Sequence, residues 1–338
     1  MIHDKIIATE LYIAQNQVTA TVQLIDEGAT VPFISRYRKE ITGSLDEVQV
    51  AYIRDRITQL RELDKRREAI LKSISEQGKL TPELEQKLIA ALIMSELEDL
   101  YLPYKPKRRT RATIAKEKGL EPLAILILEQ GRTDIYKEAE LYIDAEKGVN
   151  SIEEALAGAK DIIAETVNED KDARSKIRKL FMDTAIIKSK LIAGKETEGI
   201  KYKDYFEWSE PIKNIPSHRL LAMRRGEKEG FLMLDISPED ETAVEILNKQ
   251  FVLSQSEASG LVKEAVADSY KRLMQPSIET DIRLGTKDNA DDDAIKVFGD
   301  NLKQLLMEAP LGQKNVLAID PGFRSGCKVV VLDKQGKL

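Results

Sequence analysis

The stretch of residues 46–77 constrains the fold most, because it is a long run that contains neither glycine nor proline. Apolar residues recur along it at intervals of three and four, which is the spacing of one face of an α-helix. These residues are Val48, Ala51, Ile57, Leu60, Leu63, Ile70, Leu71 and Ile74. Gly78 follows directly, and glycine commonly ends a helix. We therefore predict one helix of ~48 Å, at a rise of about 1.5 Å per residue.

Cap patterns predict where this helix and its neighbours begin. Ser44 and Glu47 form a capping box, in which a hydroxyl and a carboxylate each satisfy a backbone N–H group. Thr81–Pro82 predicts the start of the next helix, and Ser95–Glu98 and Ser151–Glu154 predict two more. The chain is also rich in Leu, Ile, Ala, Glu and Lys and poor in aromatic residues, which favours helix. We expect a mainly α fold.

Short helices are predicted ahead of the long one, at about residues 4–16 and 18–27. Gly28 closes the second of them, and a tight turn leads from it into residues 33–39. This arrangement is compatible with a helix-turn-helix, and it is also compatible with any helical bundle, which is the interpretation that we favour. Both interpretations stay open at this point.

Two runs near the C-terminal end have a different character. Asn315–Ile319 and Lys328–Leu332 are rich in β-branched and aliphatic residues, and Pro321–Gly326 between them contains two glycines. The pattern predicts a strand, a turn and a strand. Because an isolated two-stranded hairpin is marginally stable in water, we expect it to pack on nearby helices or on a second chain.

The rarest residues exclude several classes of protein. One cysteine cannot form an internal disulfide, and one cysteine with two histidines cannot build a four-ligand structural zinc site. The longest apolar run, Leu88–Met94, is far shorter than the ~20 residues of a membrane span. No apolar signal sequence follows Met1, and no phosphate-binding glycine motif occurs. We expect a cytoplasmic protein that holds no metal and no cofactor and does not contact membranes.

The segment Leu102–Lys118 departs most from the average charge of the chain, which is −6 overall. It has seven basic residues and one acid, Glu117; the basic residues are Lys105, Lys107, Arg108, Arg109, Arg111, Lys116 and Lys118. Guanidinium groups form planar forks that suit phosphate oxygens, and the nearby Tyr101 and Tyr104 are weaker candidates for stacking on bases. We predict nucleic-acid contacts at Lys105, Lys107, Arg108, Arg109 and Arg111. The alternative is a basic loop that docks on the chain's own acidic helices.

Two further charged clusters have simpler explanations. Seven basic residues between Lys171 and Lys190 are expected to lie on a helix face with ion pairs. The acidic run Asp288–Asp293 lacks the spacing of a calcium-binding loop. It is better explained as acids at the N-terminus of a helix, where they interact favourably with the helix dipole.

Asp320 ends the first β-rich run, in the sequence Ala318–Gly322. A carboxylate at a strand end is where metal-dependent nucleases hold one metal ligand. Such chemistry needs several converging carboxylates, and no later strand supplies them. Asp320 is therefore at most a vestigial metal ligand, and an aspartate that forms a turn before Pro-Gly explains it equally well.

Four segments of the chain have unusual sequences: EGATVPFISRYRKEITGSLDE at 27–47, EDLYLPYKPKRRTRATIAKEKGLEPLA at 98–124, PSHRLLAMRRGEKEG at 216–230 and LAIDPGFRSGCKVVVLD at 317–333. In these segments the chain resembles the bacterial Tex family of transcription accessory proteins. The resemblance implies an elongated multi-helix region at 1–314, with a helix-turn-helix-like element within about 1–80 and a long central helix. Residues 315–338 are then the start of an incomplete YqgF domain of RNase-H-like fold, represented by its first β-hairpin.

The resemblance also implies a function. Members of the family bind nucleic acid and act in transcription, and an RNA-binding OB-fold that follows the YqgF domain is their main nucleic-acid contact. We expect this chain to be the scaffold region of an RNA-binding transcription accessory protein, without catalysis of its own. Two alternatives stay open: a protein-interaction scaffold for the transcription machinery without direct nucleic-acid contact, and part of a metal-dependent RuvC-like nuclease.

Overall fold

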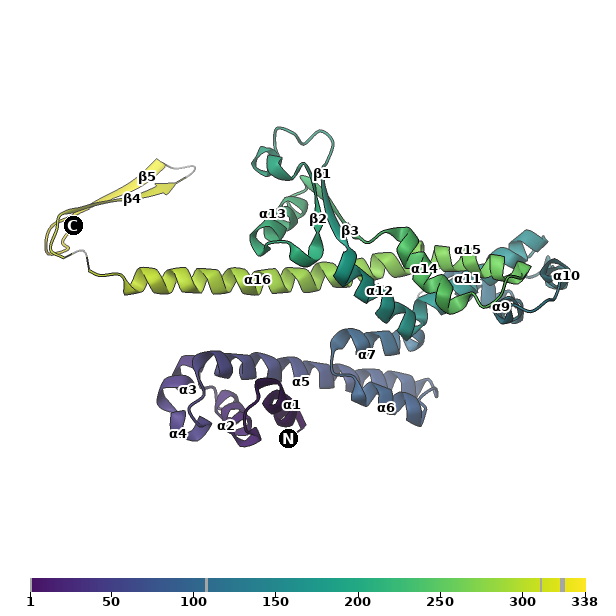
Figure 1. Cartoon of the computed structure of the whole chain (residues 1–338), viewed down its shortest axis with the longest axis horizontal. Helices are drawn as coiled ribbons and strands as arrows, with labels where there is room; N and C mark the ends of the chain where they lie inside the picture. Colours follow the sequence, from purple (N-terminus) through teal and green to yellow (C-terminus); the bar gives the residue numbers. More distant parts are fainter. Residues whose placement is uncertain (1, 107–108, 311, 323–325) are drawn as a thin grey trace. The chain divides into compact units, whose positions relative to one another are not determined.

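The computed structural model describes residues 2–106, 109–310, 312–322 and 326–338 (Figure 1). The described part is mainly helical, as predicted, and also contains a three-stranded sheet and a two-stranded hairpin. The chain divides into two compact units. The first unit comprises Met1–Asp183 and Ser237–Glu279, and the second comprises Thr184–Ile236 and Thr280–Leu338. Within the described residues, no helix has the length and apolar character needed to cross a bilayer.

The long helix predicted from the sequence is confirmed as α5, Glu47–Glu76. Four short helices precede it and pack with its first half around one core, in which Ile7, Val18, Ile34 and Ile53 are fully buried. They are α1 (Ile2–Leu11), α2 (Gln15–Asp26), α3 (Val31–Tyr37) and α4 (Lys39–Thr42). The helix-turn-helix-like element expected within these residues stays a prediction.

The predicted cap of α5 at Ser44 is wrong by two residues. Asp46 is the N-cap: its carboxylate accepts from the Gln49 N–H group at 2.8 Å, and the Gln49 side chain accepts from the Asp46 N–H group at 3.1 Å. Ser44 is not available for this role because its φ of 64° lies in the left-handed region, whereas an N-cap has extended backbone. Gly43 and Ser44 instead end α4.

The second half of α5 packs against two shorter helices over a separate core. These are α6 (Pro82–Ala90) and α7 (Met94–Tyr101), and a 3₁₀ turn follows at Leu102–Tyr104. Thr81 caps α6 as predicted, because its hydroxyl accepts from the Leu84 N–H group at 3.2 Å. The predicted cap at Ser95 is wrong, since the last extended residue is Ile93 and α7 begins directly after it.

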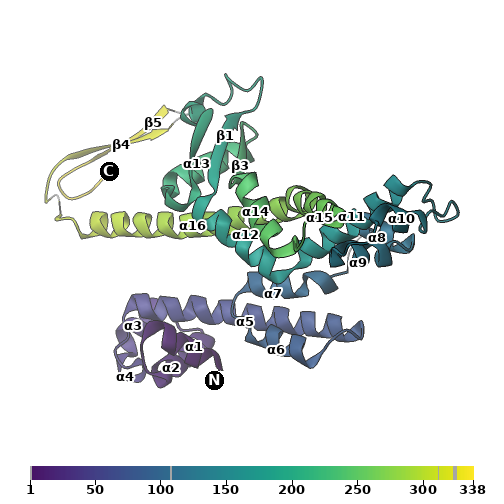
Figure 2. The same ribbon diagram turned by 45° about the vertical axis from the view of Figure 1, so that its right-hand side comes forward.

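Helix α11 is the centre of the remaining part of the first unit (Figures 1 and 2). It packs against α8, α9, α10 and α15, and its buried residues include Leu156, Ile163 and Val167. The Ser151 hydroxyl caps it as predicted, accepting from the Glu154 N–H group at 3.3 Å. The helices of this part are α8 (Arg111–Glu117), α9 (Glu121–Glu129), α10 (Ile135–Glu140), α11 (Ile152–Glu169), α12 (Lys171–Thr184), α14 (Asp240–Phe251) and α15 (Glu257–Asp268).

Helix α15 continues without a break into α16, Gln275–Met307, through a π-helical segment at Ser269–Met274. The buried Ser269 hydroxyl donates to the Ala164 carbonyl at 2.6 Å, which ties this segment to α11. The acidic run Asp288–Asp293 therefore lies in the middle of α16, and its predicted place at a helix N-terminus is wrong. Pro276 lies in the first turn of α16, directly after the π-helical segment, and no other proline in the helix breaks its hydrogen bonding.

The second unit contains the three-stranded sheet, of which the sequence indicates only a short strand at residues 231–234. Its strands are β1 (Ile186–Leu191), β2 (Glu207–Pro211) and β3 (Leu232–Ser237), in the order β2-β1-β3, with α13 (Ser217–Lys228) between β2 and β3 in the chain. Strands β1 and β2 are antiparallel. Lys188 and Lys190 were expected on a helix face, but they lie on β1 and alternate with the buried Ile187 and Ser189.

The predicted hairpin is confirmed as the antiparallel pair β4 (Val316–Gly322) and β5 (Gly326–Leu332). Leu317 stands opposite Val331, and Ile319 stands opposite Val329. All four side chains are more than half exposed, so the expectation that the hairpin packs on nearby helices is wrong for the described residues. Its pairing with a second chain and its place in a YqgF domain stay predictions.

Candidate nucleic-acid interface

The two tyrosines beside the basic segment anchor it to the core. Tyr101 is 7% exposed, its hydroxyl lies 3.0 Å from the Ser73 hydroxyl, and the Arg66 guanidinium covers its ring at 5.5 Å. Tyr104 is half-buried against the same core, and its carbonyl accepts from the Gln77 amide at 2.8 Å. Tyr101 has no open face for a base, so the structure contradicts its proposed stacking role.

The basic residues that follow lie on the surface. Lys105 and Arg109 are exposed, whereas the candidates Lys107 and Arg108 lie outside the described residues. Arg109 Nη2 is 2.7 Å from Glu117 Oε2, and both side chains are more than half exposed. Exposed ion pairs contribute roughly 0–1 kcal/mol, so a phosphate group can replace Glu117 as the partner of Arg109.

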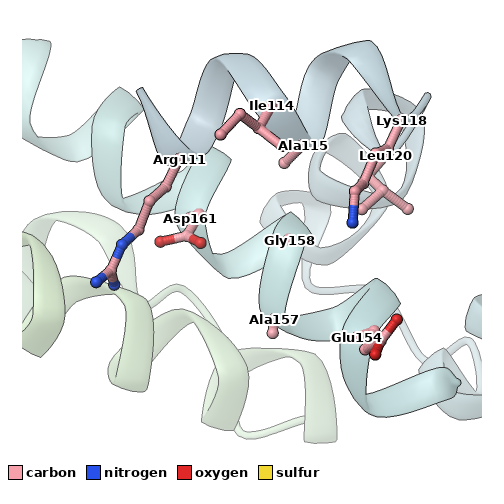
Figure 3. Close-up of a pocket in the computed structure, with 9 residues that line it drawn as sticks. All are labelled: Arg111, Ile114, Ala115, Lys118, Leu120, Glu154, Ala157, Gly158 and Asp161. Carbon is pink, nitrogen blue, oxygen red and sulfur yellow. The ribbon is translucent and has the colours of Figure 1, made fainter. Parts of the chain in front are cut away.

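A pocket of about 240 Å³ lies between α8 and α11, next to this segment (Figure 3). Its middle is apolar, and a charged pair lies at each end: Arg111 with Asp161, and Lys118 with Glu154. The apolar lining comes from Ile114, Ala115, Leu120, Ala157 and Gly158.

Burial raises the pKa of Asp161 above its ordinary value, although Arg272 and Arg111 act against the shift. Arg272 Nη2 lies 3.0 Å from an Asp161 oxygen. At the other end, hydrogen bonds from Asn150 lower the pKa of Glu154. The predicted cation Arg111 therefore faces a carboxylate of α11.

The electrostatic potential around the segment Leu102–Lys118 is consequently less positive than the sequence of the segment suggests. Lys116 pairs with Glu121 at 3.1 Å, and Lys118 donates to the Gly148 carbonyl at 2.7 Å. Asp161 and Glu121 lie outside the segment, so counting charges within 102–118 missed them both. These two acids come close to the basic side chains only when α8 and α9 pack against α11.

The part of the second basic cluster that lies on α12 forms ion pairs, as expected, and one of these networks is buried. Asp99 accepts from Arg174 Nε at 2.7 Å and from Arg178 Nη1 at 2.7 Å. The side chains of Asp99 and Arg174 are 5% and 4% exposed. These arginines connect α12 to α7 and are not part of a nucleic-acid surface.

Asp320 lies on β4, directly opposite Lys328 of β5, and it is exposed. Within the residues that the structure describes, no three His, Cys, Asp or Glu side chains are grouped so that they could hold a metal ion. The structure therefore provides no further ligands beside the one carboxylate that the sequence singled out.

Comparisons with known proteins place the chain in a family. Residues 1–75 match a model described as the Tex-like protein N-terminal domain, and residues 131–298 match one described as Tex central region-like. The chain is 45% identical, over 99% of its length, to Protein YhgF of Escherichia coli (strain K12), and covers 44% of that protein. It is 42% identical, over 98% of its length, to Protein tex of Bordetella pertussis (strain Tohama I), and again covers 44% of it.

A more distant relative is S1 RNA-binding domain-containing protein 1 of Homo sapiens, which is 26% identical over 94% of this chain. The chain covers 33% of that protein. It thus spans less than half the length of each of these curated relatives. The two model matches and the level of identity show that the chain belongs to the Tex family.

Proposed function

We propose that this chain is the nucleic-acid-contacting scaffold region of a transcription accessory protein, and that it binds the phosphates of single-stranded RNA. The observation that carries the proposal is the exposure of the basic residues Lys105, Arg109 and Arg111 on a chain with a net charge of −6. The names of its relatives support it: one is called a transcriptional accessory protein and another an S1 RNA-binding domain-containing protein. Lys107 and Arg108 remain candidates from the sequence.

Weak ion pairs at the surface allow Arg109 and Arg111 to bind RNA phosphates without the help of a large positive patch. Arg109 gives up a weak pair with Glu117, and Arg111 lies at the rim of the pocket beside α11. A phosphate that approaches both side chains replaces one exposed carboxylate and releases condensed counterions from the RNA. Local charge, and not the net charge, then controls association.

The test is the salt dependence of binding of a fluorescein-labelled 12-nucleotide oligouridylate, measured by anisotropy. Losing two phosphate contacts in Arg109→Ala/Arg111→Ala lowers the slope of log K against log salt by about 1.4, at roughly 0.7 per contact on a single strand. The matched control is Arg54→Ala/Lys72→Ala, which removes two exposed cations of α5. If the first variant has the same affinity and slope as the wild type, Arg109 and Arg111 do not contact the RNA phosphates.

A second candidate function is a protein-interaction scaffold for the transcription machinery. The pairing of Arg109 with Glu117 and of Lys116 with Glu121 favours it, because these cations already have partners within the fold. A wild-type chain that shows no saturable RNA binding even at low salt would favour this alternative.

A third candidate is part of a metal-dependent nuclease, with Asp320 as one ligand. We expect no Mg²⁺-dependent cleavage of RNA or DNA by the 338-residue chain. Turnover that persists on purification and is lost in Asp320→Ala would contradict this expectation.

A further inference from the structure

Two aromatic side chains lie exposed, one helical turn apart, on α3. Phe33 is 38% exposed and Tyr37 is 64% exposed, and their ring centroids are 5.6 Å apart at an interplanar angle of 44°. The opposite side of α3 is fixed in the core through the buried Val31 and Ile34. The two rings are therefore held on the surface by a packed helix, although core formation would favour burying them.

One cationic side chain lies over these rings, and two more adjoin Tyr37 in the sequence. Arg38 Cζ lies 4.7 Å from the centre of the Phe33 ring, and Arg38 Nη1 donates to the Tyr37 carbonyl at 2.9 Å. Arg36 and Lys39 are exposed on either side of Tyr37 in the sequence. In the described part of the chain, none of these three cations forms an ion pair with a carboxylate.

We propose that Phe33, Arg36, Tyr37, Arg38 and Lys39, called the α3 patch, form a second contact for single-stranded nucleic acid. A base stacks on the open Tyr37 ring, Arg38 holds the Phe33 ring beside it, and Arg36 and Lys39 bind the flanking phosphates. Stacking on an aromatic side chain is tolerant of sequence, because every base has a π-face. The patch shares no residue with the Lys105–Arg111 segment and does not depend on it.

Charge decides between nucleic acid and a protein partner. The centre of a protein interface is typically enriched in aromatic residues and arginine, but it is depleted of charged residues as a group and of lysine in particular. The α3 patch instead has three cations among the four consecutive residues Arg36–Lys39. Aromatic rings interleaved with cations match a stacked strand and its phosphates.

The experiment separates stacking from charge. Tyr37→Ala is expected to weaken binding of a 12-nucleotide oligouridylate by at least about fivefold, whereas Tyr37→Phe keeps the ring and binds as the wild type does. A 12-residue abasic phosphodiester binds wild type and Tyr37→Ala equally, because it has no bases to stack. Tyr136→Ala is the matched control, since Tyr136 is 49% exposed on the acidic helix α10.

Ultraviolet crosslinking of the same oligouridylate provides a second measurement, with a crosslinked peptide that contains Tyr37 as the expected result. Equal binding by wild type and Tyr37→Ala, with no such crosslink, overturns the proposal. So does a Tyr37→Ala variant that loses binding of a glutamate-rich peptide while its binding of oligouridylate is unchanged, because the patch then serves a protein partner. Comparison with Arg109→Ala/Arg111→Ala distinguishes the two contacts. Each variant can weaken binding without the other, so one contact can be disproved while the other is supported.

Discussion

At the scale of single residues, the buried carboxylate of Asp99 on α7 forms ion pairs with two arginines of α12. Arg174 and Arg178 of α12 each donate to it over 2.7 Å. Removing one partner of a buried ion pair costs about 3–5 kcal/mol, because it leaves charge enclosed without its counter-charge. We predict that Asp99→Ala lowers the free energy of unfolding by about 3–5 kcal/mol. The measurement is urea denaturation followed by far-ultraviolet circular dichroism.

Asp55→Ala is the control for this prediction. Asp55 pairs with the adjacent Arg54, and both side chains are at least half exposed. Such a surface change is expected to alter stability by at most about 0.5 kcal/mol. Equal effects of the two substitutions would show that the Asp99 network does not stabilise the fold.

Two helical glycines differ in the space around them, and alanine substitutions measure that difference. A Cβ at Gly158 would lie 2.4 Å from Leu120 Cδ1, and Leu120 is 1% exposed in a packed core. A Cβ at Gly260 meets nothing within 4 Å. We predict that Gly158→Ala destabilises by about 1–3 kcal/mol, as overpacking does, and that Gly260→Ala stabilises by up to about 1 kcal/mol.

Thermal unfolding of the two variants checks these signs. Because the alanine methyl group at position 158 also lies at the pocket beside Asp161, the melting temperature is measured without any ligand. A Gly158→Ala variant as stable as Gly260→Ala would mean that Leu120 moves aside at little cost.

At the scale of elements, helix α1 is tied to α5 by Glu10. The Glu10 carboxylate accepts from Arg56 at 2.8 Å and from Tyr52 at 3.0 Å. The hydrogen bond from Arg56 is the main reason why the pKa of Glu10 lies below its ordinary value of 4.5. The folded state therefore binds a proton at Glu10 less readily than the unfolded state does. The stability from this contact is fully present above the unfolded pKa and is lost as the pH falls through the folded pKa.

We predict that Glu10→Gln is less stable than the wild type at pH 7 and that the difference shrinks as the pH falls below about 4.5. Hydrogen exchange of the α1 amides at several pH values is the measurement. A double-mutant cycle with Arg56→Gln isolates the pair. A coupling energy that is the same at pH 3 and pH 7 would rule out this contact as the source.

Local signals explain which elements the sequence could predict. The α5 helix is predictable from a long periodic run of apolar residues and from Gly78, because both signals lie within or directly next to the helix in the sequence. Strand β1 was missed because its pairing involves β2, about twenty residues further along, and β3 beyond that. The cap of α5 shifted from Ser44 to Asp46 because the backbone at Ser44 is committed to ending α4.

The candidate site was predictable in part for the same reason. Clustered cations near Arg109 are visible in the sequence, but their partners Asp161 and Glu121 come from other helices. Tyr101 was mistaken for a surface residue because it adjoins the basic segment. Its position four residues after the fully buried Leu97 places both on one helix face, and this spacing was the available signal of burial.

At the scale of the whole molecule, the two candidate nucleic-acid contacts belong to one unit, and the exposed apolar hairpin belongs to the other. The net charge of −6 is compatible with nucleic-acid binding because the described basic residues Lys105, Arg109 and Arg111 and the α3 patch are local features of the surface. Both belong to the first compact unit. The large exposed apolar side chains of β4, β5 and the C-terminal half of α16 belong to the second unit.

The C-terminal half of α16 has an apolar stripe that we predict causes self-association. Ile295, Phe298, Leu302 and Leu305 recur at intervals of three and four and are between 43% and 69% exposed. Contiguous exposed apolar surface is removed from water when chains associate, so we expect sedimentation velocity to show concentration-dependent oligomers. Phe298→Glu should shift the chain to monomer, because it places a charge in the stripe. Gln304→Glu adds the same charge away from the stripe, and an equal shift in that variant would attribute the effect to net charge alone.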